Sequence, residues 1–437
     1  MEILFLVISV PSLFIMTRHS LARNLVACLL LALPMAQAKA VTAREVNMAF
    51  GQEVFADENL WDDDVDVLAQ RLRWPLESKT STDSSYRKYP RPDDRLLGSR
   101  SYSNALYGEE GKVSSISLVF ANKGDAVTYS QHALNNAKMA SERDAQIRKF
   151  PQQIQNDKRN ISEALTRLFG EPSADRFGQG RETREFVKRW DWNGHTFLLA
   201  SPRDEYVVLR IMSVDSANAG GKLRISDSEM RSRVASRVER RSNGDVVLKD
   251  MPMVNQGAKG YCVPATWERV MRYMGVPADM YVLAMAGQTE VGGGTQIDAI
   301  TAGASDTIMR SGRRAESASI NFDALSVSKY IDRGLPLMWA MFSTSDYNKA
   351  VDSRMAARRA MSDPKLWKKE LANARMAAKK LIKDSQSRHI CMIIGYNKET
   401  GEIAVSDSWG PEYAERWITS DEAVAVTQAS TVTLINF

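Results

Sequence analysis

Cysteine and histidine are scarce in this chain of 437 residues, which has three cysteines and four histidines. Disulfide-stabilised secreted folds need several cysteine pairs, so this number excludes a fold held together by a disulfide framework. The net charge is only +5, which gives no reason to expect a nucleic-acid partner. After residue 40 there is no run of about 20 apolar residues, so no membrane span is expected there.

The N-terminus has the pattern of an export signal. From Met16 the chain has two arginines, then an apolar run over 25–35, then small residues that offer cleavage sites up to Ala40. The apolar stretch before Met16 has no basic flank, so Met16 is the expected start, and a membrane-inserted hairpin is the alternative. We therefore expect residues 1–40 to be a signal peptide and the mature protein to be secreted or periplasmic.

The rest of the chain divides at a charged junction. Residues 41–225 are predicted to form an α+β domain of unknown role, with Asn193-Gly194 as a strong β-hairpin turn signal. Residues 226–245 read as a charged helical linker, and a second domain is expected over 246–437. Within the first domain, the polar stretch 77–95 is predicted to be a long surface loop.

A basic segment precedes the end of the second domain. Over residues 364–384 apolar positions recur at helical spacing, after an aspartate cap and a proline at the first helical position. Between residues 352 and 384 there are ten lysines and arginines against four acidic residues. The segment is either a basic arm for an anionic surface or substrate, or an amphipathic helix with a solvated face, and the second interpretation is favoured.

Two histidines lie in the first domain, at positions 132 and 195. A metal site or an acid–base pair would need a second histidine, a cysteine or paired carboxylates at ligand spacing. None accompanies His132 or His195, so both are predicted to be structural. No metal or other cofactor is expected.

Cys262 falls in the stretch VNQGAKGYCVPAT. The residues that follow it place apolar side chains at helical spacing, Pro264 is tolerated only in a first turn, and Gly275 ends the pattern. Cys262 is therefore expected at the N-terminus of a helix, where free N–H groups and the helix dipole stabilise a thiolate. Gln256, six positions earlier, could donate a side-chain N–H to an oxyanion together with the backbone N–H of Cys262.

A base for the thiol is available further along the chain. His389 opens an apolar strand, and Asp407 lies on the next strand. In an antiparallel hairpin the two share a face if the connecting loop has three or five residues. The carboxylate would then orient the imidazole. Because an amide can also accept the imidazole N–H, we expect Asp407→Asn to be the mildest substitution at this site.

These residues carry a family resemblance. QGAKGYC resembles the Gln-x5-Cys signature of papain-like cysteine peptidases, and SDSWG resembles their Asn-Ser-Trp-Gly motif with aspartate in place of asparagine. Together with RHICMIIGYN, the similarity is closest to the C39-like branch, over residues 246–437. It implies an α+β papain-like fold, in which a helix bearing the nucleophile lies on an antiparallel sheet. The residues it implies are Cys262 as nucleophile, His389 as general base, Asp407 as orienting acid, Gln256 as oxyanion donor and Trp409 as a shield for the His–Asp bond.

The function predicted from the sequence is an exported cysteine peptidase. It would hydrolyse a peptide or protein substrate through a thioester acyl-enzyme. Two alternatives stay open: an acyl transferase of transglutaminase type, which uses the same residue order, and a non-catalytic peptide-binding domain of the same fold. Substrate, cleavage specificity, oligomeric state and the role of residues 41–225 are not specified by the sequence.

Overall fold

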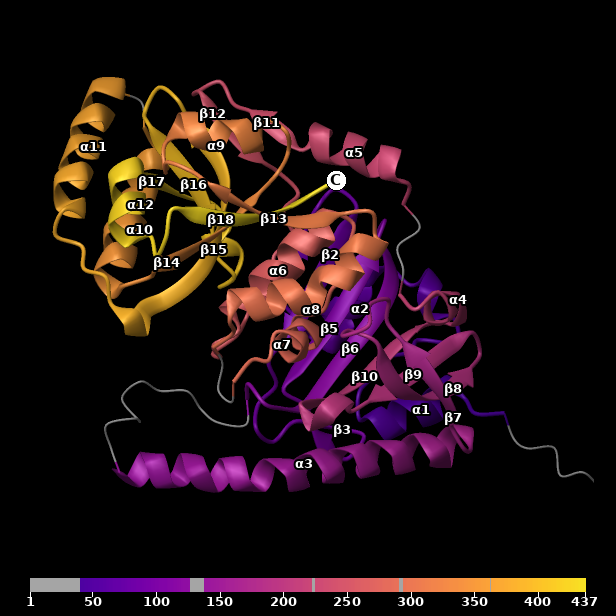
Figure 1. Ribbon diagram of the computed structural model, residues 1–437. Helices are drawn as coiled ribbons and strands as arrows, with labels where there is room; N and C mark the ends of the chain where they lie inside the picture. The colour runs from indigo at the N-terminus through magenta and orange to yellow at the C-terminus, as the bar shows by residue number, and fades with distance from the viewer. Residues whose placement is uncertain (1–39, 126–136, 222–224, 291–293, 362) are drawn as a thin grey trace, which may run out of the picture. The chain divides into compact units, whose positions relative to one another are not determined.

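Two large antiparallel sheets, each accompanied by helices, make up the protein (Figure 1). The computed structural model describes residues 40–125, 137–221, 225–290, 294–361 and 363–437. This arrangement confirms the predicted α+β class. The predicted signal peptide with Met16, and His132 in the first domain, lie outside the described residues.

The first sheet has eight strands in the order β1-β2-β5-β6-β10-β9-β8-β7, and all its strand pairs are antiparallel. Its strands are β1 (Leu76–Lys79), β2 (Asp83–Lys88), β5 (Ser103–Glu109), β6 (Lys112–Asn122), β7 (Ser173–Phe177), β8 (Glu185–Trp192), β9 (His195–Ala200) and β10 (Tyr206–Ser213), with a small separate pair β3 (Arg95–Leu96) and β4 (Ser99–Arg100). The Asn193-Gly194 turn joins β8 to β9, as predicted.

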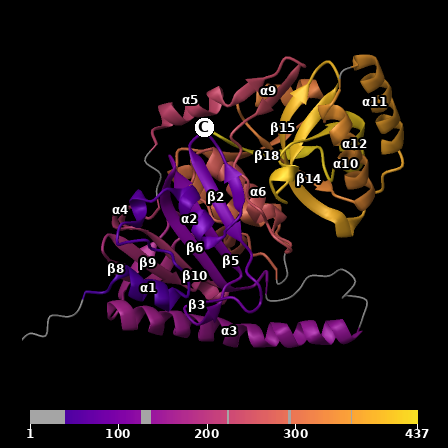
Figure 2. The same cartoon turned by 180° about the vertical axis from the view of Figure 1, so that it is seen from behind.

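Both faces of this sheet are covered, so its central strands are apolar on both sides. On β10, Leu209 belongs to a core shared with α1, α2 and α3, whereas Val208 belongs to a core shared with α6 and α7. Figures 1 and 2 show α2 on one side of the strands and α6 and α7 on the other, with α3 along the lower edge of the sheet. The helices are α1 (Ala43–Phe50), α2 (Val65–Leu72), α3 (Ala137–Phe169), α6 (Cys262–Tyr273) and α7 (Met280–Ala286); α4 (Val214–Asn218) follows β10.

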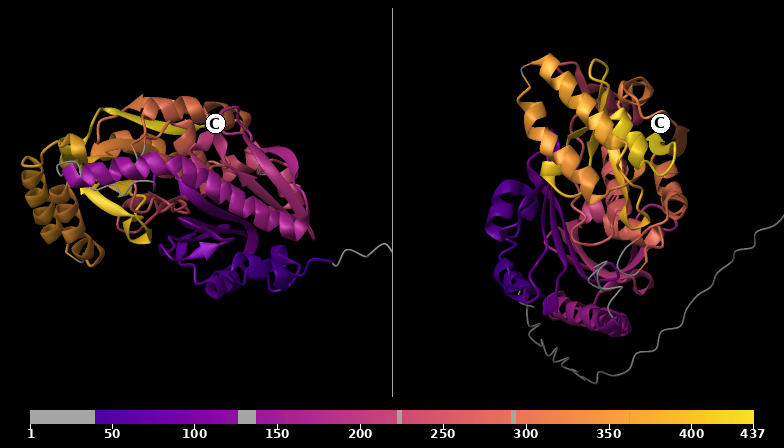
Figure 3. Two further views of the ribbon diagram at one scale, coloured as in Figure 1. Left: turned by 90° about the horizontal axis from the view of Figure 1, so that it is seen from below. Right: turned by 90° about the vertical axis from the view of Figure 1, so that its left-hand side faces the viewer.

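Two segments of the first domain differ from their predictions. In the stretch 160–170, apolar spacing and a glycine at the C-cap predict a short helix. This stretch is instead the last part of α3, a helix of 33 residues that runs past the strands of the first sheet (Figure 3). The stretch 77–95, predicted to be a surface loop, instead supplies most of β1 and all of β2. The prediction was wrong because the charged residues Glu77 and Arg87 form an ion pair inside the fold. Arg87 Nε lies 2.6 Å from Glu77 Oε1.

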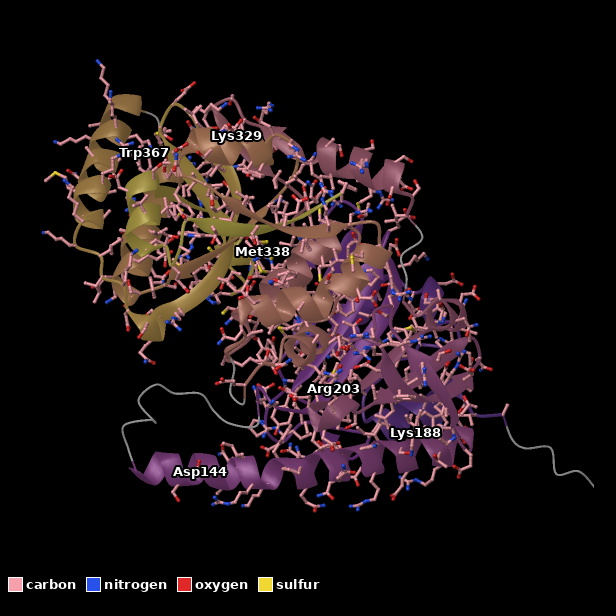
Figure 4. The ribbon with its side chains drawn as sticks, viewed as in Figure 1. Asp144, Lys188, Arg203, Lys329, Met338 and Trp367 are labelled. Atoms are coloured by element: carbon pink, nitrogen blue, oxygen red, sulfur yellow. The ribbon has the colours of Figure 1, made fainter. Side chains whose placement is uncertain are left out.

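The second sheet has eight strands, in the order β11-β12-β15-β14-β18-β13, with β16 and β17 added on the other side of β15. These strands are β11 (Val238–Arg240), β12 (Asp245–Leu248), β13 (Arg314–Ser319), β14 (Leu337–Phe342), β15 (Arg388–Asn397), β16 (Glu402–Ser406), β17 (Arg416–Thr419) and β18 (Thr431–Asn436). Met338 on β14 lies in the core of this sheet (Figure 4).

The remaining helices are α5 (Asp227–Ser236), α8 (Ile297–Arg310), α9 (Ala324–Ile331), α10 (Ser345–Arg359), α11 (Pro364–Ala378) and α12 (Ser420–Val426). The charged linker helix predicted over 226–245 is shorter than expected, because Val238–Arg240 pairs with β12 as a strand. α11 has the predicted aspartate cap, and it buries Trp367, Leu371, Ala374 and Ala378 on one face (Figure 4). Among the described residues, no helix has the length and apolar character to span a membrane.

Candidate active site

Cys262 is the first residue of α6, as predicted, and its side chain is partly buried. Ten of the twelve residues of this helix are buried, because one side packs on the second sheet and the other on the first. The helix is therefore more deeply enclosed than its apolar stripe suggests. The first N–H groups of a helix have no partner within it, so the backbone at Cys262 presents donors to the site.

The register of β15 and β16 brings His389 and Asp407 to the same face. Asn397 pairs with Glu402, so the connection has four residues, and the condition of a three- or five-residue loop is not met. With four residues, odd positions would face even ones, but a bulge between Ile393 and Gly395 shifts the pairing by one residue. Beyond the bulge, odd-numbered residues of β15 lie opposite odd-numbered residues of β16. The side chains of His389 and Asp407 therefore point to the same face and meet.

Cys262, His389 and Asp407 form a hydrogen-bonded chain. His389 Nε2 lies 2.7 Å from Asp407 Oδ1, and the imidazole is also hydrogen-bonded to the thiol of Cys262. Because Asp407 occupies Nε2, the thiol meets the Nδ1 side of the ring. Trp409 stacks on the imidazole, with ring centroids 4.7 Å apart and planes inclined by 30°. The indole thus covers the ring that joins the thiol to the carboxylate.

The contacts of Cys262 favour a thiolate–imidazolium pair. Burial raises the pKa of the thiol, but the hydrogen bond and charge of His389, with the N–H groups of Ile390 and Val263, hold that pKa below its ordinary value. Burial lowers the pKa of His389, yet its bonds to Asp407 and Cys262 raise it to about 9. Each charge therefore stabilises the other.

Arg416, on β17, completes the surroundings of Asp407. Its Nη2 lies 2.5 Å from Asp407 Oδ2, and both side chains are almost fully buried. Burial would raise the pKa of the carboxyl, but His389 and the arginine hold it below its usual range. The guanidinium also lies 5.4 Å from the ring centroids of both Trp409 and Tyr413. Sequence reasoning missed this residue, and no local motif around it indicates the ion pair.

Gln256 is tied to the same loop as the acid. Its backbone N–H donates to the carbonyl of Ser408, 2.9 Å away. Its side-chain Nε2 donates to the carbonyl of Lys259 at 3.1 Å, and its buried Oε1 has no protein partner. An amide nitrogen carries two hydrogens, so one N–H of Gln256 is left after the bond to Lys259.

Arg269 is a second buried arginine that the sequence reasoning missed. It lies on α6 two turns after Cys262, and it is fully buried. Its guanidinium donates to the carbonyl of Pro252 at 2.7 Å, to Ser406 Oγ at 2.6 Å and to Ser408 Oγ at 3.4 Å. Burial lowers its pKa to about 10. These bonds connect the nucleophile helix to the strand and loop on either side of Asp407.

The other candidate groups lie apart from this chain. His195 is fully buried, with Nδ1 3.1 Å from the carbonyl of Trp192 and rings of Phe55 and Trp61 around it, as expected for a structural residue. Cys391 is a buried free thiol two residues from His389. Within the described ranges, no cluster of three histidine, cysteine or acidic side chains is arranged to hold a metal ion.

A cavity of about 300 Å³ lies at the other end of α6. It is lined by Met271 and Arg272 of that helix, and by Tyr107 and Arg210 of the first sheet. Cys262, His389 and Asp407 do not line this cavity. The cavity is therefore separate from the candidate site.

Comparison with known proteins gives one finding, for residues 248–430. No curated protein matches the chain. A family model, described as the Peptidase_C39 like family, matches residues 248–430. That range contains Gln256, Cys262, His389, Asp407 and Trp409, together with Arg416. The match confirms that this part of the chain is similar to the C39-like cysteine peptidases.

Proposed function

We propose that residues 246–437 form a cysteine peptidase domain of papain-like fold, which hydrolyses peptide bonds in a peptide or protein substrate. The observation that carries this proposal is the hydrogen-bonded chain from Cys262 through His389 to Asp407, with the thiol at the N-terminus of α6. A structural cysteine needs neither an imidazole partner nor a helix terminus. Packing of α6 against β15 agrees with a nucleophile helix on an antiparallel sheet.

In the proposed first step, the thiolate of Cys262 attacks the peptide carbonyl carbon and a C–S bond forms. The His389 imidazolium then gives its proton to the leaving amine as the C–N bond breaks, which leaves a thioester on the enzyme. In the second step, His389 takes a proton from water, the resulting hydroxide attacks the thioester, and the thiolate leaves. Asp407 stabilises the imidazolium and fixes the orientation of its ring.

The carbonyl oxygen becomes negatively charged in both steps. In our proposal the donors are the backbone N–H of Cys262 and the N–H of Gln256 that is not bonded to Lys259. Donors of this kind accelerate the reaction because they are already oriented when the charge develops. The proposal includes a preceding α+β domain over residues 41–225, a junction over 226–245, and export directed by residues 1–40 to the periplasm or the medium.

The proposal is tested by labelling the purified protein with a peptidyl electrophile that reacts with thiols, followed by peptide mass spectrometry. We expect modification of Cys262 and protection of Cys391, which is almost fully buried. His389→Ala should suppress the labelling, because the thiolate loses its cationic partner. Cleavage of a peptide library, with Cys262→Ala as the control, then separates hydrolysis from binding alone. Labelling without any cleavage, in the presence or absence of an amine acceptor, would refute a catalytic role.

A further inference from the structure

The loop that carries Gln256 is held by the first domain. Between the end of β12 at Leu248 and the start of α6, residues 249–261 contain no helix or strand of the sheets. Several groups of the first domain bond to this loop. They are Ser81 with Asp250 (3.0 and 2.7 Å), Ser78 Oγ with the N–H of Met253 (2.9 Å), Glu77 Oε1 with the N–H of Asn255 (2.8 Å), Tyr89 with the carbonyl of Asn255, and Asp125 with Lys259.

One of these contacts is an ion pair whose lysine is buried. The side chain of Lys259 is only 2% exposed, and its ammonium lies 2.9 and 3.2 Å from the two carboxylate oxygens of Asp125. Aromatic rings surround it, with the ammonium 4.7 Å from the centroid of Tyr89, 5.8 Å from Tyr261 and 5.5 Å from Tyr281. A lysine in such a place needs a counter-charge and ring faces to offset its lost hydration.

The anchored lysine is also the residue that orients Gln256. The carbonyl of Lys259 accepts the side-chain N–H of Gln256, and the backbone N–H of Gln256 is bonded to Ser408. The position of Lys259 therefore determines which hydrogen of the Gln256 amide is bonded to its carbonyl. The other hydrogen of that amide is left for a substrate oxygen. Between them, Gly257 has φ +69°, and a Cβ there would lie 2.8 Å from the ring of Tyr89. The tyrosine thus closes on the loop at a left-handed position next to Gln256.

The contacts at Asn255 fix the main chain itself. Glu77, almost fully buried, accepts from the Asn255 N–H with the same oxygen that binds Arg87 at 2.6 Å. Tyr89, on the other side, donates to the Asn255 carbonyl. The main-chain N–H and the main-chain carbonyl of Asn255, the residue before Gln256, are therefore both bonded to the first domain.

We infer that the first domain is a positioning element for the oxyanion donor. Asp125 and Tyr89 set the place of Lys259, Glu77 and Tyr89 set the place of Asn255, and together they set the place of Gln256. The inference rests on the proposed peptidase function. It assigns residues 41–225 a direct part in the rate of the reaction, exerted on the oxyanion loop and not on the thiolate–imidazolium pair. Lys259 is a positioning residue, because it acts through Gln256.

The test uses the full-length protein and the variant Lys259→Met, which keeps the length of the side chain and removes its charge. We expect kcat to fall about 10- to 100-fold, less than the roughly 10²–10³-fold loss when an oxyanion donor is removed, because Gln256 would be misplaced but still present, while KM changes by less than about threefold. The rate of Cys262 labelling should stay within about twofold of the native rate, since the thiolate contacts are untouched. Lys123→Met is the matched control. Lys123 also forms an ion pair, with Glu205 at 3.0 Å, and it lies two residues before Asp125, the partner of Lys259.

A double-mutant cycle distinguishes positioning from general destabilisation. If Lys259 acts through the amide, Lys259→Met should cost less than about threefold in a Gln256→Ala background. Hydrogen exchange should also become faster over residues 253–261 and stay unchanged in the middle of α6. A native kcat for Lys259→Met, or the same loss in both backgrounds, would overturn the inference alone. Failure of Cys262 to be labelled in the native protein would refute the proposed function and this inference with it.

Discussion

Arg416 and His389 occupy different oxygens of the same buried carboxylate. Asp407 Oδ1 lies 2.7 Å from His389 Nε2, and Oδ2 lies 2.5 Å from Arg416 Nη2. The carboxylate thus accepts from two donors at once, and it is 1% exposed. An asparagine has only one acceptor oxygen. The structure therefore changes what is expected from the substitution that the sequence presents as mild.

Asp407→Asn should lower kcat/KM by about 10²-fold, because either the imidazole or the guanidinium would then face an NH₂ group inside the fold. Adding Arg416→Gln should restore activity at least tenfold, since a glutamine oxygen can accept from the new amide. The measurement is a four-member cycle of kcat/KM on a cleaved peptide. Arg240→Gln, at an exposed arginine paired with Asp332, serves as the control. A mild single variant, or no recovery in the double variant, would contradict this account.

The sequence predicted the parts of this site that have local patterns. Apolar spacing and Pro264 located the start of α6, and the strand of His389 was recognised from its apolar run. The bulge after Ile393, which brings His389 and Asp407 to one face, has no such signal, because it is set by the pairing of two strands. The two residues share a face as the sequence suggests, but they do so through this bulge and not through a loop of three or five residues.

Pairing across the fold explains the remaining differences. Glu77 and Arg87 make their stretch look like a solvated loop, and only their mutual contact allows them to be buried strand residues. Lys259 and Arg416 likewise resemble surface residues until Asp125 and Asp407 are placed beside them. Such partners lie far apart in sequence or on different elements, so periodicity cannot reveal them.

The reactivity of Cys262 should follow the ion pair with His389. The pKa of the thiol is held below its ordinary value of about 8.5, so alkylation should be fast at pH values where a free cysteine is mostly protonated. Peptide cleavage should decline as pH rises through about 9, where His389 loses the proton needed by the leaving amine. The rate of alkylation by iodoacetamide, measured against pH, follows the titration of the thiol. The value of kcat/KM, measured against pH, follows the alkaline decline in cleavage.

His389→Ala is the control for this pH dependence. Without the imidazolium, burial dominates, and the apparent pKa of the thiol should rise to about 8.5 or above. If the native thiol already titrates like a free cysteine, the resting enzyme has no ion pair and the proposed role of His389 is wrong.

Trp409 should affect the alkaline limb of the same profile. Its indole covers the imidazole of His389 at 4.7 Å, and a smaller side chain would admit water to the bond with Asp407. Water weakens the interaction that raises the pKa of His389, so Trp409→Ala should move the alkaline limb below pH 9. Trp409→Phe, which keeps a ring, should leave the limb nearly in place. Equal pH profiles for all three proteins would show that the indole does not shield the site.

Glu268 provides a prediction about stability that is independent of catalysis. It lies on α6, almost fully buried, and accepts from the N–H of Met280 at 2.7 Å. Burial raises its pKa from 4.5 to about 7, although Arg272 and Arg87 oppose the change. Because the folded state holds this proton more tightly than the unfolded chain, the contribution of Glu268 to stability is greatest below pH 4.5 and is lost as pH rises to about 7.

At about 1.4 kcal/mol for each pKa unit, this loss amounts to roughly 3 kcal/mol in the free energy of unfolding. Glu268→Gln cannot ionise, so its stability relative to the native protein should increase by that amount between pH 4.5 and pH 8. Urea unfolding at both pH values measures the difference, with Glu229→Gln on the exposed face of α5 as the matched control. Parallel pH dependence in Glu268→Gln and the native protein would mean that Glu268 stays ionised inside the fold, compensated by its two arginines.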